Sequence, residues 1–373
     1  MNLPALLRHE DGSAVTPETW PLRRRELLSL FTEHIYGRPP QVPAEFELAV
    51  AEESSIALNG AATRRQLVLT FGGRVKVHLL LWIPNNRRGP APVFLGLNFQ
   101  GNHTTHPDPA ILLPQPWDGW KREFAARGAM HSRWPVEFIV SRGYAVATAC
   151  ANDIDPDVHD GFTNGIHALE TAPRDVTSGG TIAAWAWGLS RLLDALERQP
   201  EIDAKRAIVL GHSRMGKTAL WAGANDERFA AAISNNSGCL GASLSRHRFG
   251  ESIEQINKGF PHWFSKRCLE YVNNEDRLPV DQHELVALLA PRGVYVASAS
   301  EDAWADPEGE FMSAVEASKI YELLGLPGLG ATTQPPAGRS VGGRIRYHIR
   351  KGRHDIELED WQHYVNFADD LLR

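Results

Sequence analysis

The stretch Ala207-Ile208-Val209-Leu210-Gly211-His212-Ser213-Arg214-Met215-Gly216 contains the clearest fold signal in the chain. Four apolar residues typical of a buried strand lead into a short turn, and the sequence after it, from Lys217 to Gly223, is typical of a helix. A serine on such a strand–turn–helix connection is lifted above the sheet, as in the nucleophile elbow Gly-x-Ser-x-Gly. Met215 takes the fifth place of that pattern and Gly216 the sixth. The context still predicts Ser213 as a nucleophile.

The segments on either side of this turn predict a mostly parallel sheet. A helix is expected at 22–36, followed by a hairpin in which 66–70 and 75–84 flank Gly72-Gly73. Further strands are expected at 92–98, 144–149, 207–210, 230–234, 293–299 and 345–349, and further helices at 136–142, 181–199, 312–324 and 358–372, with a loop at 325–343. Strands that alternate with helices indicate a sheet covered on both faces. With a serine turn midway, the order predicts an α/β-hydrolase fold, a three-layer sandwich, as a single domain over residues 1–373 with an N-terminal extension and loop insertions.

The composition excludes several classes of protein. Hydrophobic residues make up 43% of the 373 residues and charged residues 23%, as in ordinary globular proteins. The net charge of −6 indicates no nucleic-acid surface, and no apolar run approaches the roughly 20 residues that span a membrane. The first nine residues show no signal-peptide pattern.

Cysteine and tryptophan give weaker indications. Three cysteines are too few for a disulfide framework and predict buried thiols. Eleven tryptophans are many, and some lie in polar, loop-like stretches, such as 117–120, Trp134 and Trp304. Exposed tryptophans suit carbohydrate or aromatic ligands, although packing accounts for most of them.

The general base is expected after the last strand, because in this fold the chain order is serine, acid, histidine. His354 lies there, just before the closing helix. His348 falls inside the strand pattern and His363 inside the helix, so position favours His354.

The acid is expected after the strand at 293–299, where Glu301 and Asp302 arrive together. Either carboxylate could orient the histidine ring, and the sequence does not separate them. Asp302 is favoured, because the acid often follows a small residue that closes the strand, here Ala299.

Two cations follow the nucleophile. The backbone N–H of the residue after the nucleophile, Arg214, normally contributes to the oxyanion hole. Its guanidinium is expected to bind an anionic substrate group or the oxyanion, rather than to be an exposed turn charge. Lys217, one helical turn beyond Ser213, either reaches the pocket rim or is a solvated helix charge.

A competing motif is present, because Gly211-x-x-x-x-Gly216-Lys217-Thr218 matches the phosphate-binding P-loop literally. That loop is usually rich in glycine inside, whereas this one contains His212, Arg214 and Met215, and no acid of the Walker-B type follows a strand nearby. The nucleophile elbow is therefore the better interpretation.

Several motifs resemble those of one family. The stretch 211–217 resembles the nucleophile motif of bacterial glucuronoyl esterases, carbohydrate esterase family 15. The resemblance continues through 226–229, 234–238, 249–251, 278–283, 301–307 and 352–355. It implies cleavage of the ester that joins 4-O-methylglucuronic acid on glucuronoxylan to lignin alcohols. Ser213 would be the nucleophile, His354 the base and Arg214 the oxyanion stabiliser.

The resemblance also implies that Lys217, Glu251 and Trp304 hold the sugar. Fungal members keep a catalytic glutamate where this chain has Asn236, so the acid should come from Glu301 or Asp302. Fungal disulfides are not evidently supported by three cysteines. A polymeric substrate implies a secreted or periplasmic enzyme, expected to be a monomer.

Two other functions are less consistent with these residues. An acetyl xylan esterase, or another carbohydrate esterase on the same fold, would not need Arg214, Lys217 and Glu251 to meet at one sugar. A non-catalytic carbohydrate-binding homologue predicts a broken triad, whereas every member has a candidate here. No metal or cofactor is expected, because the histidines lack metal-ligand spacing.

Overall fold

The strands form one sheet in the computed structural model, which describes residues 1–114 and 125–372. Their order is β1-β2-β3-β5-β4-β6-β7-β8-β10-β9. Pairing is parallel from β5 through β10, and antiparallel among β1, β2, β3 and β5 and between β10 and β9. The strands are β1 Glu47–Ala57, β2 Ala62–Phe71, β3 Val75–Pro84, β4 Ala91–Asn98, β5 Ala145–Cys150, β6 Ile202–His212, β7 Ala231–Asn235, β8 Gly293–Ala299, β9 Ser340–Gly342 and β10 Ile345–Arg350.

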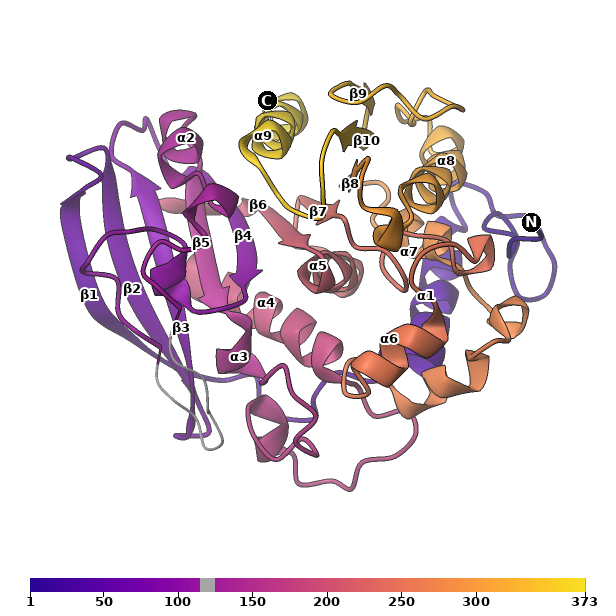
Figure 1. Ribbon diagram of the computed structural model, residues 1–373, viewed down its shortest axis with the longest axis horizontal. Coiled ribbons are helices and arrows are strands. Elements are labelled where there is room, and N and C mark those ends of the chain that lie inside the picture. Colours follow the sequence, from indigo (N-terminus) through magenta and orange to yellow (C-terminus); the bar gives the residue numbers. More distant parts are fainter. Residues whose placement is uncertain (115–124, 373) are drawn as a thin grey trace.

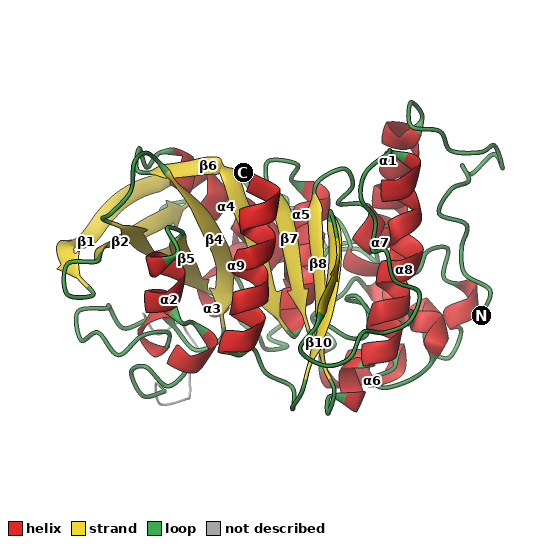
Figure 2. Ribbon diagram, turned by 90° about the horizontal axis from the view of Figure 1, so that it is seen from above, coloured by secondary structure: helices red, strands yellow, loops and turns green. Residues whose placement is uncertain are grey.

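Helices cover both faces of this sheet. They are α1 Trp20–Phe31, α2 Val136–Ser141, α3 Ala151–Ile154, α4 Thr181–Glu197, α5 Arg214–Asn225, α6 Ile253–Gly259, α7 Gln282–Ala287, α8 Pro307–Leu323 and α9 Leu358–Leu372. Figure 1 shows α2 and α9 on one side of the central strands and α3, α4 and α5 on the other. Seen from above, the strands form a twisted row from β1 to β10, with α9 running alongside the central strands (Figure 2).

The side chains of the central strands alternate between two hydrophobic cores. Along β4, Val93 and Leu95 pack in the core that includes α4 and α5, whereas Phe94 between them packs with α2 and α9. Successive side chains of a strand point to opposite faces, so a strand buried on both faces must be apolar at every position. The predicted α/β-hydrolase sandwich is confirmed.

The predicted hairpin and the alternating strands and helices are all present. The strand β6 starts earlier than predicted, at Ile202, and α5 starts at Arg214 itself. The sequence does not predict β1, because it is a largely exposed edge strand of mixed composition without a continuous apolar run. Within the predicted loop 325–343, residues 340–342 form the short strand β9.

The cysteines and most tryptophans are packed. Cys150, Cys239 and Cys268 are buried free thiols, as predicted. Trp134 is buried, whereas the side chain of Trp304 is exposed. The loop tryptophans Trp117 and Trp120 lie outside the described residues. In the described part of the chain, no helix is long and apolar enough to cross a membrane.

A substitution at Gly211 tests how closely the backbone at the start of the turn approaches the backbone of Met215. A Cβ atom there would lie 1.9 Å from the Met215 carbonyl oxygen, and the two backbones would have to separate. We expect Gly211→Ala to lower the free energy of unfolding by about 3 kcal/mol or more. Gly89 has an ordinary φ, and a Cβ atom there would have nothing within 4 Å, so Gly89→Ala is the control and should change little. Urea denaturation measures both; equal effects would contradict the close-approach argument.

Candidate active site

Ser213 occupies a strained turn between β6 and α5. Its φ of 59° and ψ of −128° are unusual for a residue other than glycine, and such strain clusters at functional sites. The Ser213 N–H donates to Asn235 O at 2.9 Å, which fixes the turn against the end of β7. A Cβ at Gly216 would lie 3.0 Å from the Ser237 Cβ. The glycine in the sixth place thus lets α5 pack closely against the segment after β7.

His354 and Asp302 form a hydrogen-bonded pair at the carboxyl end of the sheet. His354 Nδ1 lies 2.5 Å from Asp302 Oδ2. The His354 ring also packs against His212, the residue before Ser213, with ring centroids 4.5 Å apart. The segment between β10 and α9, which carries His354, reaches down towards the start of α5 (Figure 1). Ser213 and the histidine–aspartate pair are therefore brought to the same end of the sheet.

Of the two candidate acids, Asp302 contacts the histidine. Asp302 is buried, whereas Glu301 is exposed. Burial acts to raise the pKa of Asp302, but the hydrogen bond and charge of His354, together with a hydrogen bond from Asn236, outweigh it and hold this pKa below its usual value. Asp302 is therefore ionised at neutral pH and suited to orient an imidazole.

Asn236, directly after β7, binds the Asp302 carboxylate. Its Nδ2 donates to Asp302 Oδ2 at 2.8 Å, and its φ is 48°. The preceding residue, Asn235, shares a hydrogen bond with His212 Nδ1 at 2.6 Å and donates to Tyr364 Oη at 2.8 Å. Asn235 thus binds His212 directly, and Asn236 supports His354 through the Asp302 carboxylate.

Arg350 holds the segment that carries His354. Its side chain is fully buried and pairs with the equally buried Asp360, Nε to Oδ2 at 2.9 Å. Its Nη2 donates to the carbonyl oxygens of Arg353 and Asp355 at 2.8 and 2.7 Å, on either side of His354. No sequence motif indicates Arg350, because a charged residue at a strand end has no pattern that reveals burial.

Arg214 points into a cluster of aromatic rings. Its guanidinium carbon lies 4.7 Å from the Trp263 ring centroid, 5.1 Å from that of Phe260 and 5.6 Å from that of Phe99. Its Nη1 pairs with the Asp157 carboxylate. Its Nε is buried and has no hydrogen-bond partner among the described residues. Arg214 is therefore not an exposed turn charge.

Lys217 is buried, so it is not a solvated helix charge. Its Nζ donates to Ser237 O. Burial lowers its pKa, and the nearby charge of Glu251 partly opposes that effect. The Glu251 N–H donates to Trp304 O at 2.9 Å, so the segments that carry these two residues are joined. The structure thus brings Glu251 towards both Lys217 and Trp304.

A polar hollow adjoins Glu251. It has a volume of about 230 Å³. Its lining combines hydroxyl, amide and charged side chains with one exposed aromatic ring, among them Ser245, Arg248, Phe249, Glu251, Asn273 and Glu275. Such a mixture can hydrogen-bond a polyhydroxylated ligand and pack against its apolar face.

Glu310 is a second buried carboxyl that the sequence does not reveal. It lies in the first turn of α8, where it accepts from Ser298 Oγ at 2.6 Å and from the Gly238 N–H at 2.9 Å. Burial raises its pKa to about 8. It joins α8 to the ends of β7 and β8, which carry Asn236 and lead to Asp302.

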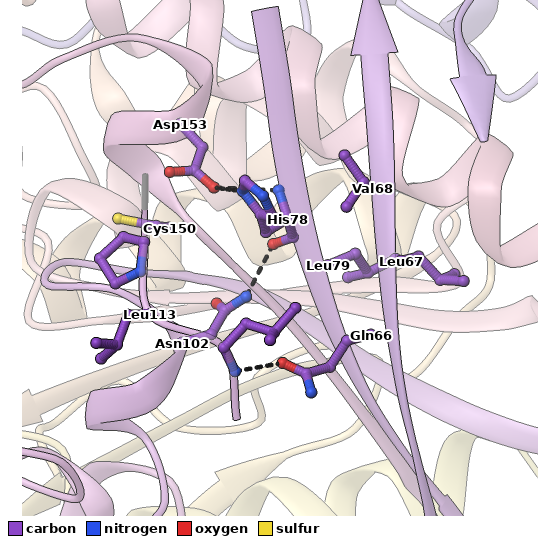
Figure 3. A pocket seen from close by; sticks show the side chains of 11 residues that line it. Gln66, Leu67, Val68, His78, Leu79, Asn102, Leu113, Cys150 and Asp153 are labelled. Carbon is purple, nitrogen blue, oxygen red and sulfur yellow. Dashed lines mark hydrogen bonds and ion pairs between the residues drawn. The ribbon is translucent and has the colours of Figure 1, made fainter. Parts of the chain in front are cut away.

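Another histidine–aspartate pair lies in a separate pocket at β2 and β3 (Figure 3). His78 Nδ1 lies 2.9 Å from Asp153 Oδ2, and Asn102 Nδ2 donates to His78 O at 2.9 Å. The pocket lining contains Cys150, and no serine among the described residues. Burial raises the pKa of the Cys150 thiol far above its usual range. The described part of this pocket therefore lacks an activated nucleophile.

Comparison with known proteins finds relatives that are described as esterases of carbohydrates. A family profile described as "Glucuronyl esterase, fungi" matches residues 173–325. A curated relative named carbohydrate esterase MZ0003, from an unknown prokaryotic organism, is 45% identical over 98% of this chain and 89% of its own length.

Two solved structures are similar over the whole chain. A glucuronoyl esterase from Solibacter usitatus is 41% identical, with a TM-score of 0.95 over 100% of this chain and 98% of that one. A structure described as a promiscuous CE15 esterase from a marine bacterial metagenome is 45% identical, with a TM-score of 0.91 over 99% and 96%.

Arg350 provides a test of how the His354 segment is held. Arg350→Met would leave the Asp360 carboxylate buried without its cation, and breaking such a pair costs about 3–5 kcal/mol. We expect a loss of stability of that order in urea denaturation. Arg346→Met, on the same strand, removes an ion pair to the exposed Asp370 and should cost about 1 kcal/mol or less. Equal losses for the two variants would argue against a special role for Arg350.

Proposed function

The chain belongs to the glucuronoyl esterases of carbohydrate esterase family 15, and we propose that it hydrolyses esters of glucuronic acid with Ser213 as nucleophile. The observation that supports this most strongly is the hydrogen-bonded pair His354–Asp302 beside the strained turn of Ser213. A serine hydroxyl is a weak nucleophile until a positioned base accepts its proton.

In the proposed reaction, Ser213 Oγ attacks the glucuronoyl carbonyl carbon while His354 Nε2 accepts the hydroxyl proton. Asp302, bonded to Nδ1, holds the ring in the required tautomer and stabilises the imidazolium. The alcohol leaves with the proton from His354, and an acyl-enzyme remains on Ser213. Water, deprotonated by His354, then attacks the acyl carbon. The bond from that carbon to Ser213 Oγ breaks, His354 returns the proton to Oγ, and glucuronate is released.

The oxyanion would be stabilised by Arg214. Its backbone N–H lies at the start of α5, where helix N–H groups point outward without an intrahelical partner. The guanidinium offers a second donor, because the Arg214 side chain is still 26% exposed while Asp157 binds its Nη1. Preorganised donors of this kind act most strongly where negative charge develops.

The sugar would be held by Lys217, Glu251 and Trp304. An ammonium and a carboxylate can share the hydroxyl groups of one ring, as donor and as acceptor respectively. The exposed indole of Trp304 offers a flat apolar surface. The polar hollow lined by Glu251 provides room next to that carboxylate.

The natural substrate we propose is the ester between glucuronoxylan and a lignin alcohol, which would be met outside the cell or in the periplasm. The relatives described as glucuronoyl or glucuronyl esterases support this choice of acid component. That the chain acts as a single-domain monomer stays a prediction.

Ser213 and the acid are tested with benzyl glucuronate. We expect Ser213→Ala to abolish turnover, and Asp302→Asn to lower kcat by roughly 10³- to 10⁴-fold, because the wrong imidazole tautomer would be favoured. Glu301→Gln is the matched control and should stay within about twofold of the wild type, since Glu301 is exposed. Retained turnover in Ser213→Ala, or a larger loss in Glu301→Gln than in Asp302→Asn, would refute the assignment.

The sugar contacts are tested by comparing two esters. Glu251→Gln should raise KM for benzyl glucuronate by about tenfold, because a charged hydrogen bond to a hydroxyl is worth roughly 1.5–3 kcal/mol. For p-nitrophenyl acetate, which has no sugar, kcat/KM should stay within about twofold. Equal losses on both esters would show that Glu251 does not bind the sugar. Faster release of acetate from acetylated xylan than hydrolysis of benzyl glucuronate would favour an acetyl xylan esterase.

A further inference from the structure

Asp157 lies outside every motif discussed above, yet its carboxylate is next to the nucleophile turn. It belongs to the connection between α3 and α4. Oδ2 pairs with Arg214 Nη1. Oδ1 accepts hydrogen bonds from His262 Nε2 at 3.0 Å and from Trp263 Nε1 at 2.7 Å. Three donors from two other segments therefore converge on this one carboxylate.

The aromatic rings around Arg214 do not fix its orientation by themselves. Trp263 and Phe260 are stacked on each other, with centroids 3.7 Å apart and planes 3° apart. A cation above such rings is attracted through the ring face. This attraction does not select which edge of the guanidinium points where. A hydrogen bond to one defined nitrogen does make that selection.

Asp157 makes this selection at Nη1. With that edge bound, Nε is buried and the Arg214 side chain is still 26% exposed, so another part of the guanidinium faces outward. A guanidinium has five N–H donors in a fixed plane, so fixing one edge also fixes the direction of the others. An Arg214 held in this way keeps its exposed N–H edge in one orientation, where an anion can bind it.

The Asp157 carboxylate is ionised when it binds Arg214. Burial acts to raise the pKa of Asp157, but the His262 hydrogen bond, the charge of Arg214 and the Trp263 hydrogen bond together outweigh it and hold this pKa below its usual value. The indole N–H and the ring nitrogen also keep the carboxylate in place independently of Arg214.

We propose that Asp157 is the positioning residue for Arg214, fixing its guanidinium so that a free N–H edge is available to the oxyanion. This inference rests on the role proposed above for Arg214. It assigns to Asp157 an effect on the transition state rather than on the binding of the sugar. Its effect must therefore appear in kcat and must require Arg214.

The test is a double-mutant cycle with benzyl glucuronate, using Asp157→Asn, Arg214→Ala and the double variant. In Asp157→Asn an amide can face Nη1 with an N–H group, which would displace the guanidinium. Loss of one oxyanion donor costs about 10²- to 10³-fold in kcat, and we expect at least about tenfold for its displacement, with KM within about threefold. In the Arg214→Ala background, the same substitution should change kcat by less than about twofold.

Asp194→Asn is the matched control. Asp194 also pairs with an arginine, Arg228, and its side chain has the same 20% exposure as that of Asp157. It lies near the end of α4 that leads to the start of β6, away from the nucleophile turn. We expect its kcat to match that of the wild type.

The outcomes separate the two proposals. If Arg214→Ala lowers kcat but Asp157→Asn does not, or if Asp157→Asn lowers it equally in both backgrounds, Asp157 does not act through Arg214. If Arg214→Ala leaves kcat unchanged, the oxyanion role of Arg214 fails and this inference fails with it. Should Asp157→Asn not fold in thermal denaturation, Asp157→Glu, which keeps the charge but moves it, goes through the same cycle with the same criteria.

Discussion

The site depends on the buried ion pair between Arg350 and Asp360. This pair takes two charges out of water, and such burial is tolerated only when further hydrogen bonds satisfy the remaining donors and acceptors. Arg350 meets that condition by binding backbone carbonyl oxygens on both sides of His354. The cost of burying a charge is therefore offset by contacts that also place the base. A chain segment with few apolar side chains is thereby tied to the end of β10.

The remaining site residues are placed by the parallel sheet itself. Parallel strands end at one common edge, so residues that follow β6, β7, β8 and β10 meet there although they are far apart in sequence. Ser213, Asn236, Asp302 and His354 arrive in this way. The residues that bind Arg214 come from outside the sheet, from the connections that cross that edge. The chemistry thus combines a rigid sheet edge with contacts from long insertions.

The sequence predicts the sheet, the turn and His354 because each leaves a local pattern: apolar runs, a serine between strand and helix, and a histidine after the last strand. It leaves Glu301 and Asp302 open, since neighbouring residues differ in burial only through tertiary packing, and the structure shows only Asp302 against His354. Asp157, Arg350 and Glu310 have no such pattern. Asp157 and Glu310 bind segments far apart in the chain, and the partners of Arg350, although within ten residues, meet it only because the segment after β10 folds back on it. An isolated charge in a sequence gives no sign of its partner.

The contact between Asn236 and Asp302 limits which of the two neighbouring strands can carry the acid. Two positions at the ends of neighbouring strands reach the same carboxylate–imidazole bond, with Asn236 Nδ2 2.8 Å from Asp302 Oδ2. Two carboxylates that close would repel each other, and one would have to take up a proton. An amide at Asn236 and a carboxylate at Asp302 avoid this repulsion, because the amide donates a hydrogen bond to the carboxylate. The geometry therefore allows an ionised acid on one of these two strands at a time, with an amide on the other.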